Sequence, residues 1–420
     1  MVNFNSAKQI KFSANFDKEI ASDVTELPSI YSGVSRWKPG RESKCCAFSS
    51  DGSKFAWCNG HGFVKVVKCN SGEDITTEEI TSRGDSANLK VQSKKRGCQI
   101  VRLLDCGKNV VSMEFAPKLP LFQSKVNSTS LLAIGLERGS IKIWNVDTGD
   151  MVYTLADHTQ SVTGLTFATK GEPLMISCSE DFTMKVWDLG EDGNMSLTIK
   201  GHNSPIHYLA LSPNDPSILA SVGMGKAVYL WKLPHKRTYK KLRLLRGHNN
   251  DVVSCSWSPD GALLATASHD TTVIVWEPFS GDQILVLGHL FPMPSPIYVG
   301  GSNGAWVKSV CFSKDGTKIA TVCEDNRIRV WKPWLQDTSM LENTIPKEGY
   351  QCRISPDGCI IAVGKQDGSV TMIKDSSTEV NSLLHLCRLA VRKSFSLSLL
   401  QTIALPPPIM EYLAYRPSIA

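Results

Sequence analysis

Short runs in which apolar and polar residues alternate recur along most of the chain. The clearest copy lies between His248 and Trp276, where three such runs are separated by SPDG at 258–261 and by His269-Asp270. Alternation with a period of two is typical of half-buried strands, and Gly and Asp tolerate the backbone angles of tight turns. The pattern therefore predicts a small antiparallel sheet in this segment.

The same pattern returns at a regular interval. Five copies end in tryptophan, at Trp144, Trp187, Trp231, Trp276 and Trp331. The intervals between these tryptophans are 43, 44, 45 and 55 residues. Two weaker copies, at 45–67 and 352–373, carry Val67 and Ile373 in the place of tryptophan. A period of about 40–45 residues with Gly-His and a late Trp is the signature of four-stranded propeller blades, which bury their faces by stacking.

These repeats resemble WD-repeat propellers over residues 31–375. The resemblance implies an all-β fold, a WD-repeat β-propeller. We expect seven blades, and an eighth built from the N-terminal segment at 1–30 stays open.

Two insertions interrupt the period. The segment 68–108 is polar and charged, and we expect a surface loop there. The segment 290–305 is rich in Pro and Gly, and either a binding loop or a packed connector fits it.

Two repeats carry His, Ser, Asp and Trp at matching positions. One set is His158, Ser179, Asp181 and Trp187, and the other is His248, Ser268, Asp270 and Trp276. The indole N–H can donate to Ser, the Ser hydroxyl to His, and the other His N–H to Asp. WD-repeat proteins use such buried networks to hold strands in place, so the resemblance implies a structural role. The occurrence of the set in two repeats argues against a single active site, and we expect no catalytic residues.

The alternation stops after about residue 378. In the segment VNSLLHLCRLAVRKS, apolar residues recur at helical spacing, which predicts an amphipathic helix. Arg388, Arg392 and Lys393 lie toward its end, where positive charge suits the helix dipole. Periodicity alone favours a helix that packs on the propeller.

Two motifs in this tail resemble the parts of a SOCS box, and together they predict one over 379–417. The spacing of Leu383, Cys387 and Val391 resembles the BC box, the helix that binds Elongin C. The resemblance assigns Elongin C binding to Leu383, Leu384, Leu386, Cys387 and Val391. The run LPPP begins 18 residues after Cys387 and resembles the LP-aliphatic-P motif that selects a cullin. It assigns cullin selection to Leu405, Pro406 and Pro408. Pro407 stands where the family has an aliphatic residue, which leaves the choice of cullin open.

A propeller followed by a SOCS box resembles the WD-repeat and SOCS-box-containing protein family. The segments DGSKFAWCNGH, SVGMGKAVYLW and GHLFPMPSPIYVGG strengthen the resemblance. It implies a non-catalytic substrate-recognition subunit of an Elongin BC–cullin–RING E3 ubiquitin ligase. The implied partners are Elongin C, Elongin B, a cullin–RING scaffold and a protein substrate that the sequence does not identify. The alternative is a non-catalytic WD-repeat signalling scaffold without a ubiquitin role.

Composition narrows the function classes further. The net charge of +6 over 420 residues is too weak for a dedicated nucleic-acid binder, so we expect no nucleic-acid partner. No run of about 18 apolar residues exists, and the first residues lack the apolar core of a signal peptide, so we expect no membrane association. No phosphate-binding loop, dinucleotide motif or paired zinc-ligand spacing occurs, and we expect no cofactor and no metal. The 13 cysteines fall largely in strand-like runs, which favours free thiols and an intracellular location, cytoplasmic or nuclear.

Overall fold

The computed structural model of the chain describes residues 24–27, 43–58, 62–69, 100–118, 130–169, 172–190, 193–235, 238–289, 306–333, 339–345, 348–374, 383–395, 397–403 and 405–415. The chain forms two compact units. Residues 21–206 and 345–376 make up one, and residues 207–344 and 377–420 belong to the other. Within the described segments, no helix combines the length and the apolar character needed to span a membrane.

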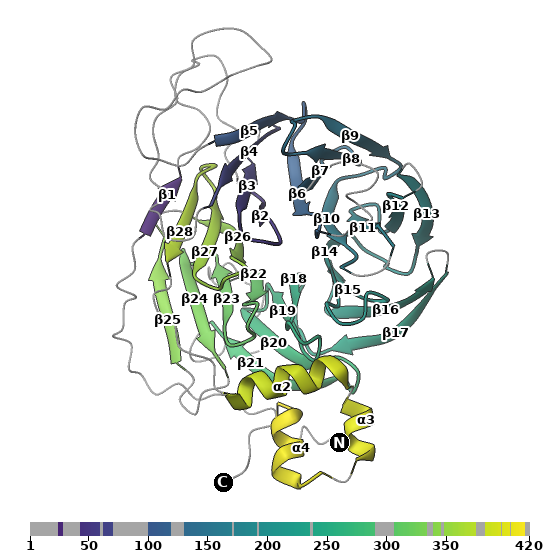
Figure 1. The fold of residues 1–420 in the computed structure, drawn as a ribbon, viewed down its shortest axis with the longest axis vertical. Coiled ribbons are helices and arrows are strands. Elements are labelled where there is room, and N and C mark those ends of the chain that lie inside the picture. Colours follow the sequence, from purple (N-terminus) through teal and green to yellow (C-terminus); the bar gives the residue numbers. More distant parts are fainter. Residues whose placement is uncertain are drawn as a thin grey trace. The chain divides into compact units, whose positions relative to one another are not determined.

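The unit of residues 21–206 and 345–376 contains four sheets of four strands each among its described residues (Figure 1). Three of them follow the chain order. Their strands are β2 Cys46–Phe48, β3 Lys54–Cys58, β4 Phe63–Lys68 and β5 Ile100–Asp105; β6 Val110–Phe115, β7 Leu131–Leu136, β8 Ser140–Asn145 and β9 Met151–Ala156; and β10 Val162–Phe167, β11 Leu174–Ser179, β12 Met184–Asp188 and β13 Asn194–Ile199. The fourth sheet has the order β1-β28-β27-β26, with bounds β1 Val24–Leu27, β26 Gly349–Ile354, β27 Ile360–Lys365 and β28 Val370–Lys374.

The N-terminal strand β1 completes this fourth sheet. It pairs antiparallel with β28, so that Leu27 lies opposite Val370. Leu27 is buried in a core with Phe55 and Trp57 of the β2–β5 sheet. Strand β1 therefore belongs to a propeller sheet although it precedes residue 31, where the sequence repeats begin. An edge strand left open at β28 would expose unpaired backbone groups, and β1 covers it.

The unit of residues 207–344 and 377–420 contains three more four-stranded sheets and three helices among its described residues. The strands are β14 Ile206–Leu211, β15 Ile218–Gly223, β16 Ala227–His235 and β17 Thr238–Arg246; β18 Val252–Trp257, β19 Leu264–Ser268, β20 Thr272–Glu277 and β21 Asp282–Gly288; and β22 Val307–Phe312, β23 Ile319–Cys323, β24 Arg327–Lys332 and β25 Ser339–Thr344. The helices are α2 Leu383–Ser394, α3 Leu397–Thr402 and α4 Pro407–Leu413.

The seven four-stranded sheets are the blades of a β-propeller. A small helical region follows the propeller in the chain. The central strands β19 and β23 are buried on both faces, since every residue of each is buried. Neighbouring sheets share hydrophobic cores, so that Ala265 and Val275 of one sheet pack with Val307 and Ile319 of the next. Every cysteine in the described part of the chain is a free thiol.

The end of the predicted insertion at 68–108 forms a strand of the first sheet. Lys68 ends β4, and β5 at Ile100–Asp105 is the outer strand of the first sheet, in which Leu104 lies opposite Val64 and is buried. The rest of the insertion, 70–99, lies outside the described residues, as does the connector at 290–305. The strand escaped prediction because only six residues of β5 interrupt a long polar stretch.

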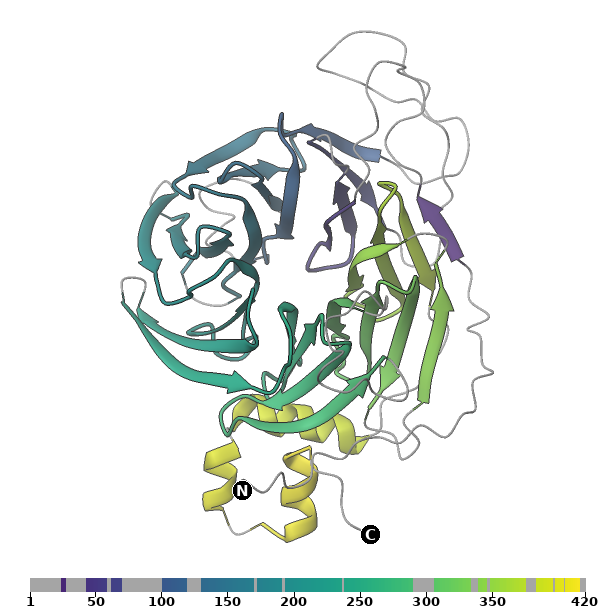
Figure 2. The ribbon, with the colours of Figure 1, turned by 180° about the vertical axis from the view of Figure 1, so that it is seen from behind.

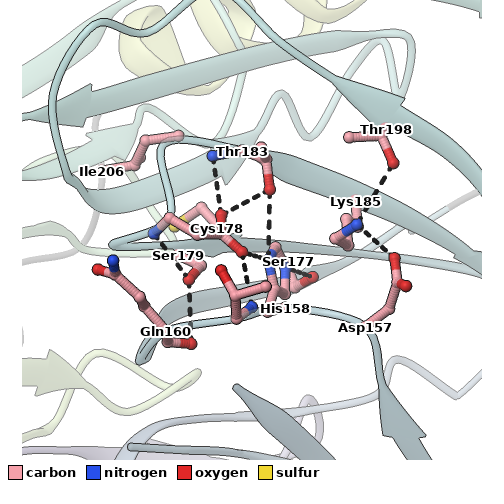
Figure 3. Close-up of polar contacts among 12 residues, drawn as sticks. Asp157, His158, Gln160, Ser177, Cys178, Ser179, Thr183, Lys185, Thr198 and Ile206 are labelled. Carbon is pink, nitrogen blue, oxygen red and sulfur yellow. Dashed lines mark hydrogen bonds and ion pairs between the residues drawn. The ribbon is translucent and has the colours of Figure 1, made fainter. Parts of the chain in front are cut away.

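Figure 3 shows the polar network inside the β10–β13 sheet. His158 Nε2 and Trp187 Nε1 each lie 2.8 Å from Ser177 Oγ, and His158 Nδ1 lies 2.8 Å from Asp181 Oδ2. With the proton on Nδ1, His158 donates to the carboxylate and accepts from the Ser177 hydroxyl, which accepts from the indole. The network thus joins the segment before β10 to β11, to β12 and to the turn between them.

The hydroxyl in this network is that of Ser177, so the assignment of Ser179 was wrong. Trp187 lies opposite Met175 in the strand pairing, and Ser177 is the next residue on the same face of β11. Ser179 lies two residues further along the strand, about 13 Å from Met175 at 3.3 Å per residue, and the indole does not extend that far. The Ser179 hydroxyl donates instead to the carbonyl oxygen of Gln160, at 3.1 Å.

The same geometry and the same correction apply to the β18–β21 sheet. His248 Nε2 lies 2.7 Å from Thr266 Oγ1, Trp276 Nε1 donates to that oxygen at 2.8 Å, and His248 Nδ1 lies 2.8 Å from Asp270 Oδ2. Thr266 therefore occupies the position expected for Ser268, which lies two residues later in β19. The search for serine alone missed a threonine with the same hydroxyl chemistry.

Two other sheets carry part of this network, which the sequence pattern did not indicate. Trp231 Nε1 donates to Ser221 Oγ at 2.8 Å. Trp331 Nε1 donates to Thr321 Oγ1 at 3.0 Å, and His289 Nε2 lies 2.9 Å from the same hydroxyl. A mid-strand hydroxyl ten residues before the tryptophan is common to all four sheets.

Candidate functional site

Helix α2 has two faces of unexpected character. Its buried residues are His385, Arg388, Leu389 and Arg392, so three of the four carry polar or charged groups. Its leucines at 383, 384 and 386 are instead 76%, 61% and 48% exposed. Exposed apolar residues that gather on one element of a folded protein mark an interaction site.

All five residues assigned to Elongin C binding lie on α2. Leu383, Leu384, Leu386 and Cys387 are exposed, and Val391 is half-buried. Leu383 and Cys387 are four residues apart, so they lie above one another along one side of the helix. The structure thus brings the set together as an apolar surface that no described part of the chain covers.

The buried face of α2 rests on the propeller of its own unit. His385 Nε2 lies 2.7 Å from the carbonyl oxygen of Asp315. Figures 1 and 2 both show α2 alongside the β18–β21 sheet. The helix therefore does pack on the propeller, as periodicity alone allowed, but it does so through the face opposite to its exposed leucines.

The residues assigned to cullin selection lie at the start of α4. Leu405 is half-buried, whereas Pro406 and Pro408 are exposed. Pro407 is the first residue of α4, and Pro406 precedes it in an extended conformation. Proline suits the first helical position, because that N–H has no partner within the helix and the ring fixes the required φ. The proline run thus begins a helix and leaves its own rings at the surface.

Buried apolar residues hold α3 and α4 together with α2. Leu400 of α3 and Leu413 of α4 are 2% and 6% exposed. The guanidinium of Arg388 lies 3.5 Å from the ring centre of Tyr412, so α2 and α4 are also joined by a cation–π contact. The three helices form one small module beside the propeller sheets of the same unit.

Comparison with known proteins agrees with this architecture. The family model "WD domain, G-beta repeat" matches residues 149–188, 193–232, 239–277 and 295–332, and the model "SOCS box" matches residues 379–414. WD repeat and SOCS box-containing protein 1 of Xenopus tropicalis is 41% identical over 396 residues, and that of Homo sapiens is 40% identical over 396. That of Danio rerio is 41% identical over 397 residues. Each alignment covers 90% of this chain and 92% of the relative. The chain belongs to the WD repeat and SOCS box-containing protein family.

In this WD repeat and SOCS box-containing protein, α2, α3 and α4 all lie within the matched SOCS box. Sequence reasoning found the exposed side of that box and missed the side that faces the propeller. Tyr415 just after α4 is the clearest example, since its hydroxyl donates to Asp260 Oδ2 at 2.5 Å. Burial, followed by the charge of Asp260, raises the pKa of Tyr415 well above its usual range, which keeps the phenol protonated as a donor. No local motif distinguishes these contact residues.

Proposed function

We propose that this chain is the substrate-recognition subunit of an Elongin BC–cullin–RING ubiquitin ligase, in which the propeller binds the target. The observation that carries the proposal is the exposed apolar face of α2, centred on Leu383, Leu386 and Cys387. A leucine with 76% of its surface in water is poorly placed for the stability of its own fold. The same residues match the positions through which a BC box binds Elongin C.

The two faces of α2 allow both contacts at once. The helix contacts the propeller through His385, Arg388, Leu389 and Arg392, and none of these belongs to the set assigned to Elongin C. Elongin C can therefore bind without displacing the SOCS box from the propeller. The exposed rings of Pro406 and Pro408 at the start of α4 offer a second surface, for the cullin.

The mechanism is recruitment. Elongin B and Elongin C would connect the SOCS box to a cullin–RING scaffold that carries the ubiquitin-loaded enzyme. A substrate held on the propeller then reacts at a high effective concentration, as in an intramolecular step. The chain supplies binding energy and position, and the bond-forming groups belong to the other subunits and to the substrate lysine.

Co-expression with Elongin B and Elongin C tests the proposal. We expect a stoichiometric complex on a sizing column, and Leu383→Ala combined with Cys387→Phe should remove it. Truncation of Leu383 alone should weaken binding by about 2 kcal/mol, roughly 30-fold in Kd, because it removes an apolar anchor residue. Leu242→Ala is the matched control, an exposed leucine on β17 outside the SOCS box, and it should bind like the wild type. Absence of a complex with the folded wild-type chain would reject the ligase function and favour the signalling scaffold.

A further inference from the structure

Two turns of identical sequence differ in how deeply their aspartate is buried. Residues 258–261 and 355–358 both read SPDG, and in each the serine hydroxyl donates to the aspartate Oδ1. Asp357 is exposed, whereas Asp260 is 0% exposed. Two contacts cover the first turn: Tyr415 donates its hydroxyl to the second oxygen of Asp260, at 2.5 Å, and Asn214 donates to the Asp260 carbonyl oxygen.

Tyr415 contacts both the propeller and α2. Its side chain is 6% exposed and packs in the core shared by the β18–β21 and β22–β25 sheets, beside Ala262 and Leu263. The guanidinium of Arg388 lies 4.6 Å from its ring centre. Its φ of 56° is a left-handed value that non-glycine residues seldom adopt, and such a conformation persists only where the surroundings impose it.

Helix α2 contacts the equivalent turn of the next sheet. Residues 313–316 read SKDG, and His385 Nε2 lies 2.7 Å from the carbonyl oxygen of Asp315. Leu389 lies beside Gly316 of this turn. The buried Arg392 interacts electrostatically with Asp260. The C-terminal tail thus contacts two successive turns, the turn at 313–316 through His385 of α2 and the turn at 258–261 through Tyr415. Contacts at two points fix both the position and the rotation of the helical module, which a single contact would not do.

We propose that a set of contacts, named here the SOCS-box anchor, holds the SOCS box in one orientation on the propeller. The anchor consists of His385, Arg388, Arg392 and Tyr415 with the turns at 258–261 and 313–316. Within it, Tyr415 is a positioning residue for ubiquitin transfer. This inference rests on the proposed function, because it concerns where ubiquitin is delivered. A rigid connection restricts which lysines the bound ubiquitin-carrying enzyme reaches. A SOCS box joined to the propeller only by the connecting chain would adopt many orientations, and the enzyme would then modify a larger set of lysines.

Hydrogen–deuterium exchange of the free chain tests the anchor without any partner. Tyr415→Phe removes only the hydroxyl, and Asp260→Asn removes the charge of its acceptor. We expect both variants to speed exchange in α2 and in the turn at 258–261 by roughly tenfold. The matched control is Asp357→Asn, which alters the same turn sequence where no described residue of the tail covers it, and it should leave α2 unchanged. Exchange in α2 that is the same in all three variants and the wild type would overturn the anchor.

The positioning role has its own readout in the reconstituted ligase, with the lysines of the propeller itself as the acceptors. Tyr415→Phe should bind Elongin BC within about twofold of the wild type and should spread ubiquitin over more lysines at a similar total rate. A purely structural defect would instead lower Elongin BC affinity and total rate together. An unchanged set of modified lysines would overturn the positioning role. If the wild-type chain bound no Elongin BC, the proposed function would fall, and the exchange data would still decide on the anchor.

Discussion

A mid-strand hydroxyl is the residue-scale feature that joins histidine to tryptophan in this protein. Thr266 Oγ1 lies 2.7 Å from His248 Nε2 and accepts from Trp276 Nε1 at 2.8 Å. All three side chains are buried, so neither nitrogen can turn to water if the hydroxyl is lost. The strand period of two explains why this position, and not the one two residues later, meets the indole.

Thr266→Val should therefore be costly although it keeps the shape of the side chain. It leaves two buried polar groups without a partner, at about 1–3 kcal/mol each. Ser268→Ala should cost about 1 kcal/mol, since its hydroxyl bonds only two backbone groups, the carbonyl oxygen of Asn250 and the N–H of Asp270. Urea unfolding of both variants, compared at equal m-values, measures the difference. Equal losses, or a larger loss for Ser268→Ala, would contradict this assignment of the network.

At the scale of elements, the first and last strands of the propeller depend on each other. Strand β1 pairs with β28 along its whole length, and Lys365 of β27 donates to Glu26 Oε1 at 2.9 Å. Leu27 adds a buried apolar side chain, worth roughly 1.5–3 kcal/mol when it leaves water. The four residues of β1, at the start of the chain, thus complete the blade that β26, β27 and β28 form near its end.

Deletion of residues 1–27 should lower the midpoint of thermal unfolding and promote self-association. The reason is that β28 would then present an unpaired edge to solvent. Calorimetry and analytical ultracentrifugation measure the two effects. Glu26→Gln is the comparison, because it keeps the strand and an amide oxygen that can still accept from Lys365, whose side chain is 1% exposed, so we expect a smaller loss than the deletion causes and no self-association. A truncated chain that stays monomeric and equally stable would refute the role of β1.

At the scale of the whole molecule, buried titratable groups couple stability to pH. Burial, and then the charge of Arg329, lowers the pKa of His289 from 6.5 to about 3. The unfolded chain therefore binds more protons than the folded chain between these values, and stability falls as the pH drops below 6.5. Burial acts to raise the pKa of Asp270, but its contacts with His248, Thr272 and Asn249 outweigh burial and lower it. Asp270 therefore adds stability above its unfolded pKa that is lost at more acidic pH.

His289→Gln should flatten the first part of this pH dependence. From pH 7 to 4.5 the wild type should lose on the order of 2 kcal/mol through His289, whereas glutamine does not titrate. Urea unfolding at a series of pH values measures the slope for both chains. Parallel slopes would show that His289 is protonated in the folded state as readily as in the unfolded state, against the prediction.

The sequence by itself determined the repeat architecture and the exposed side of the SOCS box. Both depend on local patterns: strand alternation with a tryptophan at intervals of 43, 44, 45 and 55 residues, and helical spacing from Leu383 to Val391. These signals survive in one dimension because each blade or helix forms from consecutive residues. Even the choice of Ser179 over Ser177 was wrong by only one side-chain repeat along the strand.

Only the tertiary structure decided which distant segments meet. Strand β1 closes the sheet of β28, and Tyr415 covers Asp260, which lies 155 residues earlier, rather than Asp357 in a turn of the same sequence. The physical reason is that these contacts follow from how the chain closes on itself. Identical local sequences therefore acquire different burial, and a helix with an apolar stripe can bury its basic side.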